Sequence, residues 1–282
     1  MQQGVPSRTA QRVALRRAAH QLLDAPLVFA DPLAVRIVGA EDERALRADP
    51  SRLDTTAFDR GLRAFAAARA RFVEDRLARA VEDGLAQFVV LGAGLDTFAY
   101  RNPFGGLRVF EVDHPDTQAW KRSRLEEVGV APPPSATYVA VDFGSSDWFG
   151  PLCAAGFRDD RPAAFSWLGV VTYLTLDAVR ATLRRIGSLP RGSFVIFDYG
   201  VSRALLTEWQ RAILDAAAAR VAAIGEPFVT FFDPPDLERE LRAAGFTAVE
   251  QLGPEEINAR YFSGRSDGLR AGGMARIASA RV

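Results

Sequence analysis

The stretch FVVLGAGLDTFAY, residues 88–100, decides the fold of this 282-residue chain. Its first four residues form a continuous apolar run, as in strands that are buried on both faces of a parallel sheet. Gly92 and Gly94 follow, and Asp96 comes two residues later. Glycines at the end of a strand let the backbone come close to a ligand, although they also fit a plain strand-to-helix turn. The stretch therefore predicts a strand that leads into either a binding loop or a tight turn.

Strands and helices alternate from this stretch to the end of the chain. Such alternation implies right-handed crossovers and a doubly wound α/β sheet. Before it, about 85 mostly helical residues are expected to cover the ligand site, so we divide the chain into a cap at 1–85 and a binding domain at 86–282. Strands are expected at 88–94, 108–113, 137–143, 163–170, 193–200, 247–253 and 274–282. Helices are expected at 8–23, 55–83, 115–128, 176–186, 202–223 and 233–246. The apolar segment at 228–232 is ambiguous, and an inserted substrate loop is expected at about 254–272.

Composition excludes several classes of function. Lys plus Arg and Asp plus Glu both number 35, so bulk charge favours neither a nucleic acid nor an acidic membrane as partner. The single cysteine, Cys153, excludes an internal disulfide and a cysteine-based metal cluster, and two histidines make a metal site unexpected. The N-terminus has no apolar signal core, and no run approaches the ~18 apolar residues of a spanning helix. We expect a cytoplasmic protein, as a monomer or a dimer.

Carboxylates follow the glycine loop at the ends of the next two expected strands. Glu111 and Asp113 lie about 20 residues beyond Gly92, the spacing at which a carboxylate accepts both hydroxyls of an adenosine ribose. Asp142 ends the third strand, where it can accept from an adenine amino group, and Phe143 offers an apolar face to the ring.

The kind of ligand follows from what the loop lacks and what surrounds it. The third glycine of the dinucleotide fingerprint is absent, because Thr97 stands there, and no Gly-Lys-Ser/Thr phosphate loop is present. A site rich in acceptors disfavours a pyrophosphate, which requires backbone N–H groups and cations. It suits a cationic ligand with a ribose, and S-adenosylmethionine, with its sulfonium and ammonium groups, fits.

The motifs LGAGLDTFAYR, FEVDHP, VDF, SWLGVVTYLT and NARYFSGRSDGLR resemble a bacterial family of S-adenosylmethionine-dependent methyltransferases. That family is related to leucine carboxyl methyltransferase and to the tetracenomycin-type polyketide carboxyl O-methyltransferases of secondary metabolism. The resemblance extends nearly from end to end. It implies a class I methyltransferase fold, with a Rossmann-like seven-stranded sheet, an antiparallel last strand and an N-terminal helical cover.

The resemblance also implies roles for individual residues. Arg69, with Arg71 as the alternative, would pair with the cofactor carboxylate, and Glu111 would be the fallback for the ribose. A glutamate that commonly ends the fourth strand is replaced here by Trp167-Leu168-Gly169, which implies an apolar wall. The other residues implied to bind the cofactor are Gly92 and Gly94 at its methionine end and ribose, Asp96 in the loop, Asp113 at the ribose hydroxyls, and Asp142 and Phe143 at the adenine.

The scarcity of histidine bears on the acceptor. A carboxylate nucleophile needs no general base at neutral pH, whereas a phenol or alcohol generally does. His20 is expected to pack and His114 to lie near the cofactor. We therefore expect methylation of a small carboxylic acid, with Tyr173 and Arg260 as candidates to position it; an arginine fork could also come from Arg16, Arg17, Arg265 or Arg270.

Three alternatives to a carboxyl methyltransferase stay open at this point. The first is an O-methyltransferase that acts on a phenol or hydroxyl group. The second is a nicotinamide oxidoreductase, which the missing third glycine and the lack of a Tyr-x-x-x-Lys pair disfavour. The third is a protein that binds S-adenosylmethionine without catalysis.

Overall fold

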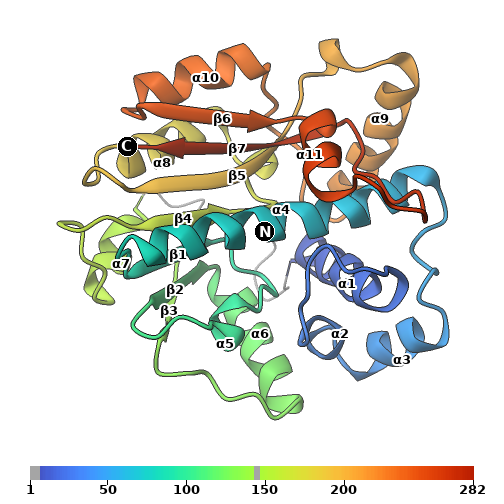
Figure 1. The fold of residues 1–282 in the computed structure, drawn as a ribbon, viewed down its shortest axis with the longest axis horizontal. Helices are drawn as coiled ribbons and strands as arrows, with labels where there is room; N and C mark the ends of the chain where they lie inside the picture. The colour runs from blue at the N-terminus through green and yellow to red at the C-terminus, as the bar shows by residue number, and fades with distance from the viewer. Residues whose placement is uncertain (1–6, 143–146) are drawn as a thin grey trace.

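A seven-stranded sheet forms the centre of the computed structural model, which describes residues 7–142 and 147–282 (Figure 1). Its strand order is β3-β2-β1-β4-β5-β7-β6. Neighbouring strands are parallel except where β7 pairs with β5 and β6. This confirms the expected sheet with an antiparallel last strand. The strands are β1 Gln87–Leu91, β2 Arg108–Asp113, β3 Ala136–Ala140, β4 Ala164–Trp167, β5 Phe194–Gly200, β6 Ala248–Leu252 and β7 Ala275–Arg281.

The strand order reverses at β1. From β1 the chain proceeds outward through β2 to β3, and it then returns to β4 on the other side of β1. The two sets of crossovers therefore diverge above the carboxyl ends of β1 and β4, which leaves the crevice where doubly wound sheets bind ligands. The glycine loop lies at this point.

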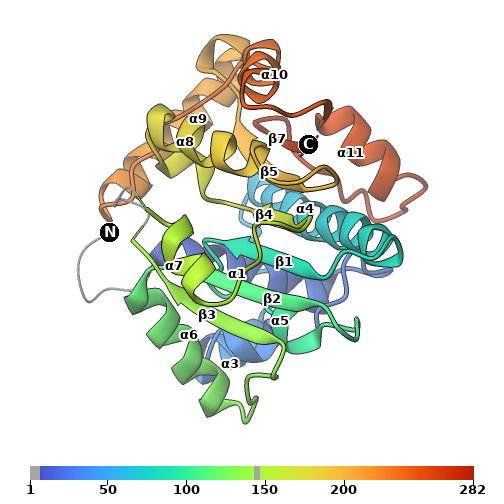
Figure 2. The ribbon, with the colours of Figure 1, turned by 90° about the vertical axis from the view of Figure 1, so that its left-hand side faces the viewer.

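Helices cover both faces of the sheet because the strands are apolar on both sides. In β1, Val89 and Leu91 face one cluster of core residues, and Phe88 and Val90 face another. Figure 2 shows the two layers on either side of the strands. The first cluster includes residues of α7 Phe149–Ala154, α8 Leu176–Gly187 and α10 Pro234–Ala243, and the second includes residues of α4 Ala57–Glu82, α5 Phe98–Arg101 and α11 Pro254–Tyr261.

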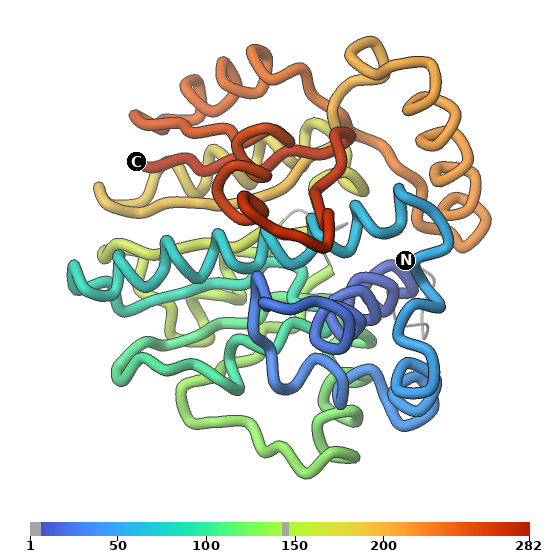
Figure 3. Tube along the Cα trace, turned by 45° about the vertical axis from the view of Figure 1, so that its right-hand side comes forward, coloured from blue at the N-terminus to red at the C-terminus, as the bar shows by residue number. Residues whose placement is uncertain are grey.

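The N-terminal region divides between two structural roles. Helix α4 packs on the sheet and shares a cluster with β1. Helices α1 Arg8–Leu23, α2 Ala34–Ile37 and α3 Ala40–Ala48 form a third cluster, which also includes Leu95 of the glycine loop and Leu125 of α6 Pro115–Glu127. Figure 3 follows this blue trace as it passes beside α4. The helical cover over the loop is thus α1 to α3, and the boundary at residue 85 stays a prediction.

The structure settles one segment that the sequence left ambiguous and differs from the expectation at another. The segment 228–232 forms no strand, and only one bridge joins Phe232 to Val201. The expected loop at 254–272 begins with α11, because Pro254 occupies the first helical turn and Glu256 accepts from the Gly253 N–H.

The helix expected at 202–223 is shorter than predicted. It is α9 Glu208–Ala222, which begins after the capping box of Thr207 and Gln210. No helix in the described part of the chain combines the length and the apolar character needed to span a bilayer.

Candidate functional site

The glycine loop is fastened to the end of β2. Gly92 has φ 67° and Gly94 has φ 47°, a left-handed conformation that glycine adopts at little cost. The Gly92 N–H donates to the Val112 carbonyl at 2.8 Å, and the Gly94 N–H donates to the Asp113 carboxylate at 2.5 Å. Gly94 therefore contacts Asp113 directly, and Gly92 contacts the residue before it, so the structure brings these three residues of the predicted site together.

Asp113 is the carboxylate best placed for a ribose. Only 8% of the residue is exposed, and its second oxygen accepts from the His114 N–H at 2.6 Å. Burial raises the pKa of Asp113 above its usual value, and the two backbone hydrogen bonds partly oppose that rise. Each carboxylate oxygen keeps lone-pair capacity for one more donor, so the residue can accept from two vicinal hydroxyls.

Glu111, the fallback for the ribose, is occupied elsewhere. It is buried beneath the site, and the Lys121 ammonium donates to it at 2.9 Å. Burial raises the pKa of Glu111, and Lys121 acts against that rise. A carboxylate enclosed with its own cation fits an internal support of β2 better than a ligand contact.

The third strand brings Asp142 to the same edge of the sheet. Asp142 follows the end of β3 and is exposed. Phe143 lies outside the described residues. The adenine contacts expected of these two residues stay predictions.

Arg69 points into the crevice, and Arg71 does not. The Arg69 guanidinium donates to Asp198 of β5 at 2.6 Å, and the other oxygen of Asp198 accepts from the Gly169 N–H at 2.6 Å. Gly169 has φ 72°, and a Cβ there would lie 3.2 Å from an Arg69 nitrogen. Arg71 is exposed and pairs with Asp75 at 2.6 Å. Of the two arginines, the structure thus places Arg69 at the carboxyl ends of β4 and β5.

Sequence reasoning missed Asp198. The available signal was its position in the strand SFVIFDYG, where a lone charge ends an apolar run. A charge in such a run is buried by the sheet and needs a partner, which Arg69 provides across 129 positions of sequence.

Trp167 lies away from these residues. Its ring is fully buried and lies 6.1 Å from that of Phe197, in the core cluster beneath α8 and α10. Asp198 and Arg69 lie on the opposite face of the sheet. A contact of Trp167 with the cofactor could therefore come only from its backbone, and the expected wall at the fourth strand stays a prediction.

Helix α1 closes the crevice over the glycine loop. Arg17 is buried and donates to Asp31 at 2.8 Å and to the Leu95 carbonyl at 3.2 Å. Thr97, which stands at the position of the missing glycine, donates to Asp31 at 2.7 Å. Asp96 lies 3.6 Å from Arg17. The loop residues expected to bind ligand thus also tie the loop to the cover, a link that the sequence did not reveal.

Tyr173 lies where α1 meets the end of β4. It is in a short 3-10 turn, and its ring lies 5.5 Å from that of Phe228. Burial raises the pKa of Tyr173 to about 12, a hydrogen bond with Thr9 lowers it, and the charge of Glu226 raises it. Glu226 accepts from the Thr9 N–H at 3.0 Å, which fixes the start of α1 there. Tyr173 is therefore a protonated hydrogen-bond donor at neutral pH.

Both histidines are held by hydrogen bonds. His20 is fully buried, with Nδ1 2.5 Å from Asp24, and its Nε2 accepts from the Phe29 N–H, so the expectation that it packs is confirmed. His114 accepts from the Asp116 N–H at 3.3 Å and so caps α6.

Arg260, expected to position the substrate, lies apart from the crevice. It is on α11, 3.2 Å from Glu250 of β6, and its guanidinium lies over the ring of Phe72. Within the part of the chain that the structure describes, no contact found for Arg260 joins it to the residues around the glycine loop. Its expected role stays a prediction that the geometry does not favour.

Comparison with known proteins gives a consistent family assignment. The sequence profile described as leucine carboxyl methyltransferase matches residues 10–187. A Bacillus subtilis protein named as a putative S-adenosyl-L-methionine-dependent methyltransferase is 30% identical over 96% of both chains. A Mycobacterium leprae protein of the same description is 37% identical over 90% of this chain and 84% of its own.

Solved structures show the same fold at lower identity. A protein from Thermobifida fusca, described as a putative methyltransferase, superposes with a TM-score of 0.59 at 18% identity, over 99% of this chain and 96% of its own. A DUF574 family protein from Streptomyces avermitilis gives a TM-score of 0.56 at 19% identity, over 95% of this chain and 96% of its own.

Proposed function

The chain belongs to the leucine carboxyl methyltransferase family, and from that premise we propose that this S-adenosylmethionine-dependent methyltransferase methylates a carboxylate oxygen of a small molecule. The observation that carries the cofactor-binding part of the proposal is the position of Asp113. It is a buried carboxylate that fastens the glycine loop and keeps acceptor capacity at the crevice.

The residues present fit the cofactor. Asp113 would accept from the ribose hydroxyls, and Arg69 would bind the cofactor carboxylate with guanidinium nitrogens that Asp198 leaves available. Gly92 and Gly94 would let the loop backbone approach the methionine half. The cofactor supplies an activated methyl group on a sulfonium, so the protein mainly has to orient the acceptor and exclude water.

Two features support a carboxylate as the acceptor. Both histidines are held in structural hydrogen bonds, and burial raises the pKa of Tyr173 to about 12, still further above neutral pH than its usual value. Neither imidazole nor this phenol is thus available to deprotonate a hydroxyl group. A carboxylate is already ionised and needs no base, and the Tyr173 hydroxyl can donate to its non-reacting oxygen.

The first test is ligand binding. S-adenosylhomocysteine should raise the melting temperature and give heat on titration, and NADH should do neither. A protein that NADH stabilises and S-adenosylhomocysteine does not would rule out the proposal.

The second test identifies the acceptor. Small carboxylic acids and phenols are screened with methyl-labelled cofactor, and the methylated atom is mapped. For a carboxylate acceptor, kcat should stay nearly constant from about pH 6 to 9, because the acceptor is already ionised and no enzyme group has to take a proton from it. Products methylated only on phenolic oxygens, with a rate that rises through this range, would favour the hydroxyl alternative.

A further inference from the structure

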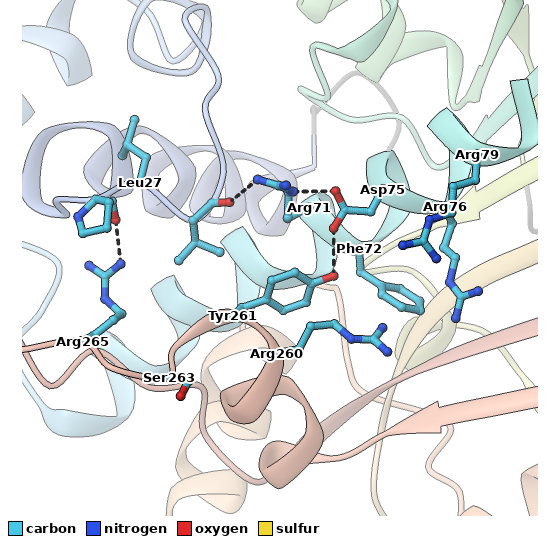
Figure 4. A pocket seen from close by; sticks show the side chains of 12 residues that line it. Leu27, Arg71, Phe72, Asp75, Arg76, Arg79, Arg260, Tyr261, Ser263 and Arg265 are labelled. Carbon is cyan, nitrogen blue, oxygen red and sulfur yellow. Dashed lines mark hydrogen bonds and ion pairs between the residues drawn. The ribbon is translucent and has the colours of Figure 1, made fainter. Parts of the chain in front are cut away.

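A cavity lies on the outer face of α4, where α11 and the loop 26–28 meet it. Its volume is about 490 Å³. Pro26, Leu27 and Val28 form one side, and Tyr261 with Ser263 forms another (Figure 4). None of the residues around the glycine loop lines it, so it is separate from the proposed methyl-transfer site.

The lining of this cavity is strongly basic. It contains a single acidic residue, Asp75, and five arginines: Arg71, Arg76, Arg79, Arg260 and Arg265. Glu250 and Asp267 pair with three of these arginines from outside the lining. With those two acids counted, the positive charges in and around the cavity still exceed the negative ones by two.

Packing orients several of these guanidinium groups. Those of Arg76 and Arg260 lie over the ring of Phe72, with their central carbons 5.2 and 5.3 Å from its centroid. Phe72 is itself almost fully buried, with 1% exposed. Arg265 donates to the Pro26 carbonyl at 2.6 Å. Side chains that are held in this way lose little further rotamer freedom when they bind a ligand.

Arg79 is the least engaged of the five. It is exposed on α4 beside Arg76, and within residues 7–142 and 147–282 no hydrogen bond or ion pair is found for its side chain (Figure 4). Arg71, in contrast, contacts both Asp75 and the Val28 carbonyl. The cavity therefore combines oriented cations with one, Arg79, whose side chain has no ion-pair partner among the described residues.

We propose that this cavity binds a small molecule that carries two linked phosphate groups. Arginine forks match phosphate oxygens in geometry, and arginines from two helices and a loop can engage phosphates from different sides. The net surplus of two charges favours a multiply charged anion over a single carboxylate. The apolar side at Leu27 and Val28 can contact the uncharged part of such a ligand.

The test uses inorganic pyrophosphate on the full chain saturated with S-adenosylhomocysteine, so that the crevice is filled. Pyrophosphate should raise the melting temperature more than sulfate does at equal ionic strength, and its titration should give a single site. Changing Arg79 and Arg76 to alanine should weaken pyrophosphate binding by roughly tenfold or more, because charge-assisted hydrogen bonds are lost.

Arg180→Ala provides the matched control. Arg180 is also a helical arginine with an acidic partner, Glu240, but it lies on α8, on the opposite face of the sheet. The Arg180→Ala variant should bind pyrophosphate with unchanged affinity. Equal stabilisation by sulfate and pyrophosphate, or affinity that persists in the Arg79 and Arg76 variants, would overturn the proposal.

The test of pyrophosphate binding can be separated from the test of the methyl-transfer proposal. Asp113→Asn, which should impair S-adenosylhomocysteine binding, should leave the pyrophosphate titration unaltered. Markedly tighter pyrophosphate binding in Asp113→Asn would place the anion beside that carboxylate, at the crevice, and would also overturn the proposal.

Discussion

Replacing Asp113 with asparagine removes the charge that we assign to the ribose and changes the shape of the site very little. The native carboxylate accepts from the Gly94 and His114 N–H groups and has capacity for two more donors. The amide nitrogen of asparagine cannot accept, so one backbone N–H and one ribose hydroxyl lose their partner. A hydrogen bond to a charged acceptor contributes about 1.5–3 kcal/mol, which corresponds to affinity for S-adenosylhomocysteine that is about 10- to 150-fold weaker.

The assay is titration calorimetry with S-adenosylhomocysteine, with a thermal melt of each free protein as a check on folding. Asp160→Asn is the control, because that carboxylate is exposed and pairs with Arg158 at the surface. It should bind as the wild type does. Affinity of Asp113→Asn within about twofold of wild type, with the fold intact, would refute the assignment of the ribose to Asp113.

The pH dependence gives a second readout of the same residue. Burial raises the pKa of Asp113, and ribose donors favour its ionised form. Lowering the pH towards that raised pKa should therefore protonate Asp113 and weaken S-adenosylhomocysteine binding. Asp113→Asn should remove this part of the pH dependence. An equally steep pH dependence in the variant would assign the titration to another group.

Three further predictions concern the loop, the support of β2 and the acceptor. Gly92→Ala places a Cβ 2.4 Å from Val170 Cγ2 in a left-handed backbone, so we expect the free energy of unfolding to fall by about 1–3 kcal/mol. Urea denaturation measures this change, and an unchanged denaturation midpoint would contradict it. Lys121→Met leaves Glu111 buried without its cation. The pKa of Glu111 in the folded protein is raised, so its contribution to stability falls as pH rises. The decrease in the free energy of unfolding caused by Lys121→Met should therefore be larger at pH 8 than at pH 5, and an equal decrease at both pH values would contradict this reasoning. Tyr173→Phe should lower kcat/KM roughly tenfold and leave S-adenosylhomocysteine affinity unchanged, and equal effects on both would argue for a structural role.

Local pattern was sufficient for the order of the elements, and it predicted a cofactor site whose individual residue roles stay predictions. The apolar run before Gly92 and the alternation after it predicted the sheet, because strands that are buried on both faces must be apolar throughout. Asp113 could be singled out because one crossover sets its distance along the chain from the glycine loop. Asp113 and the loop lie at the ends of two neighbouring parallel strands. These relations extend over about 20 residues, within the reach of periodicity and spacing.

Tertiary structure alone decided which arginine faces the crevice and where the other cations go. Arg69 and Arg71 are nearly equivalent in sequence, and only the partner in β5, Asp198, distinguishes them. Arg260 is in a segment that looked like a substrate loop, yet α11 carries it to the outer face of α4. The physical reason is that a buried charge is stabilised by a partner in space, and the distance along the chain between the two residues is set by the fold and not by local pattern.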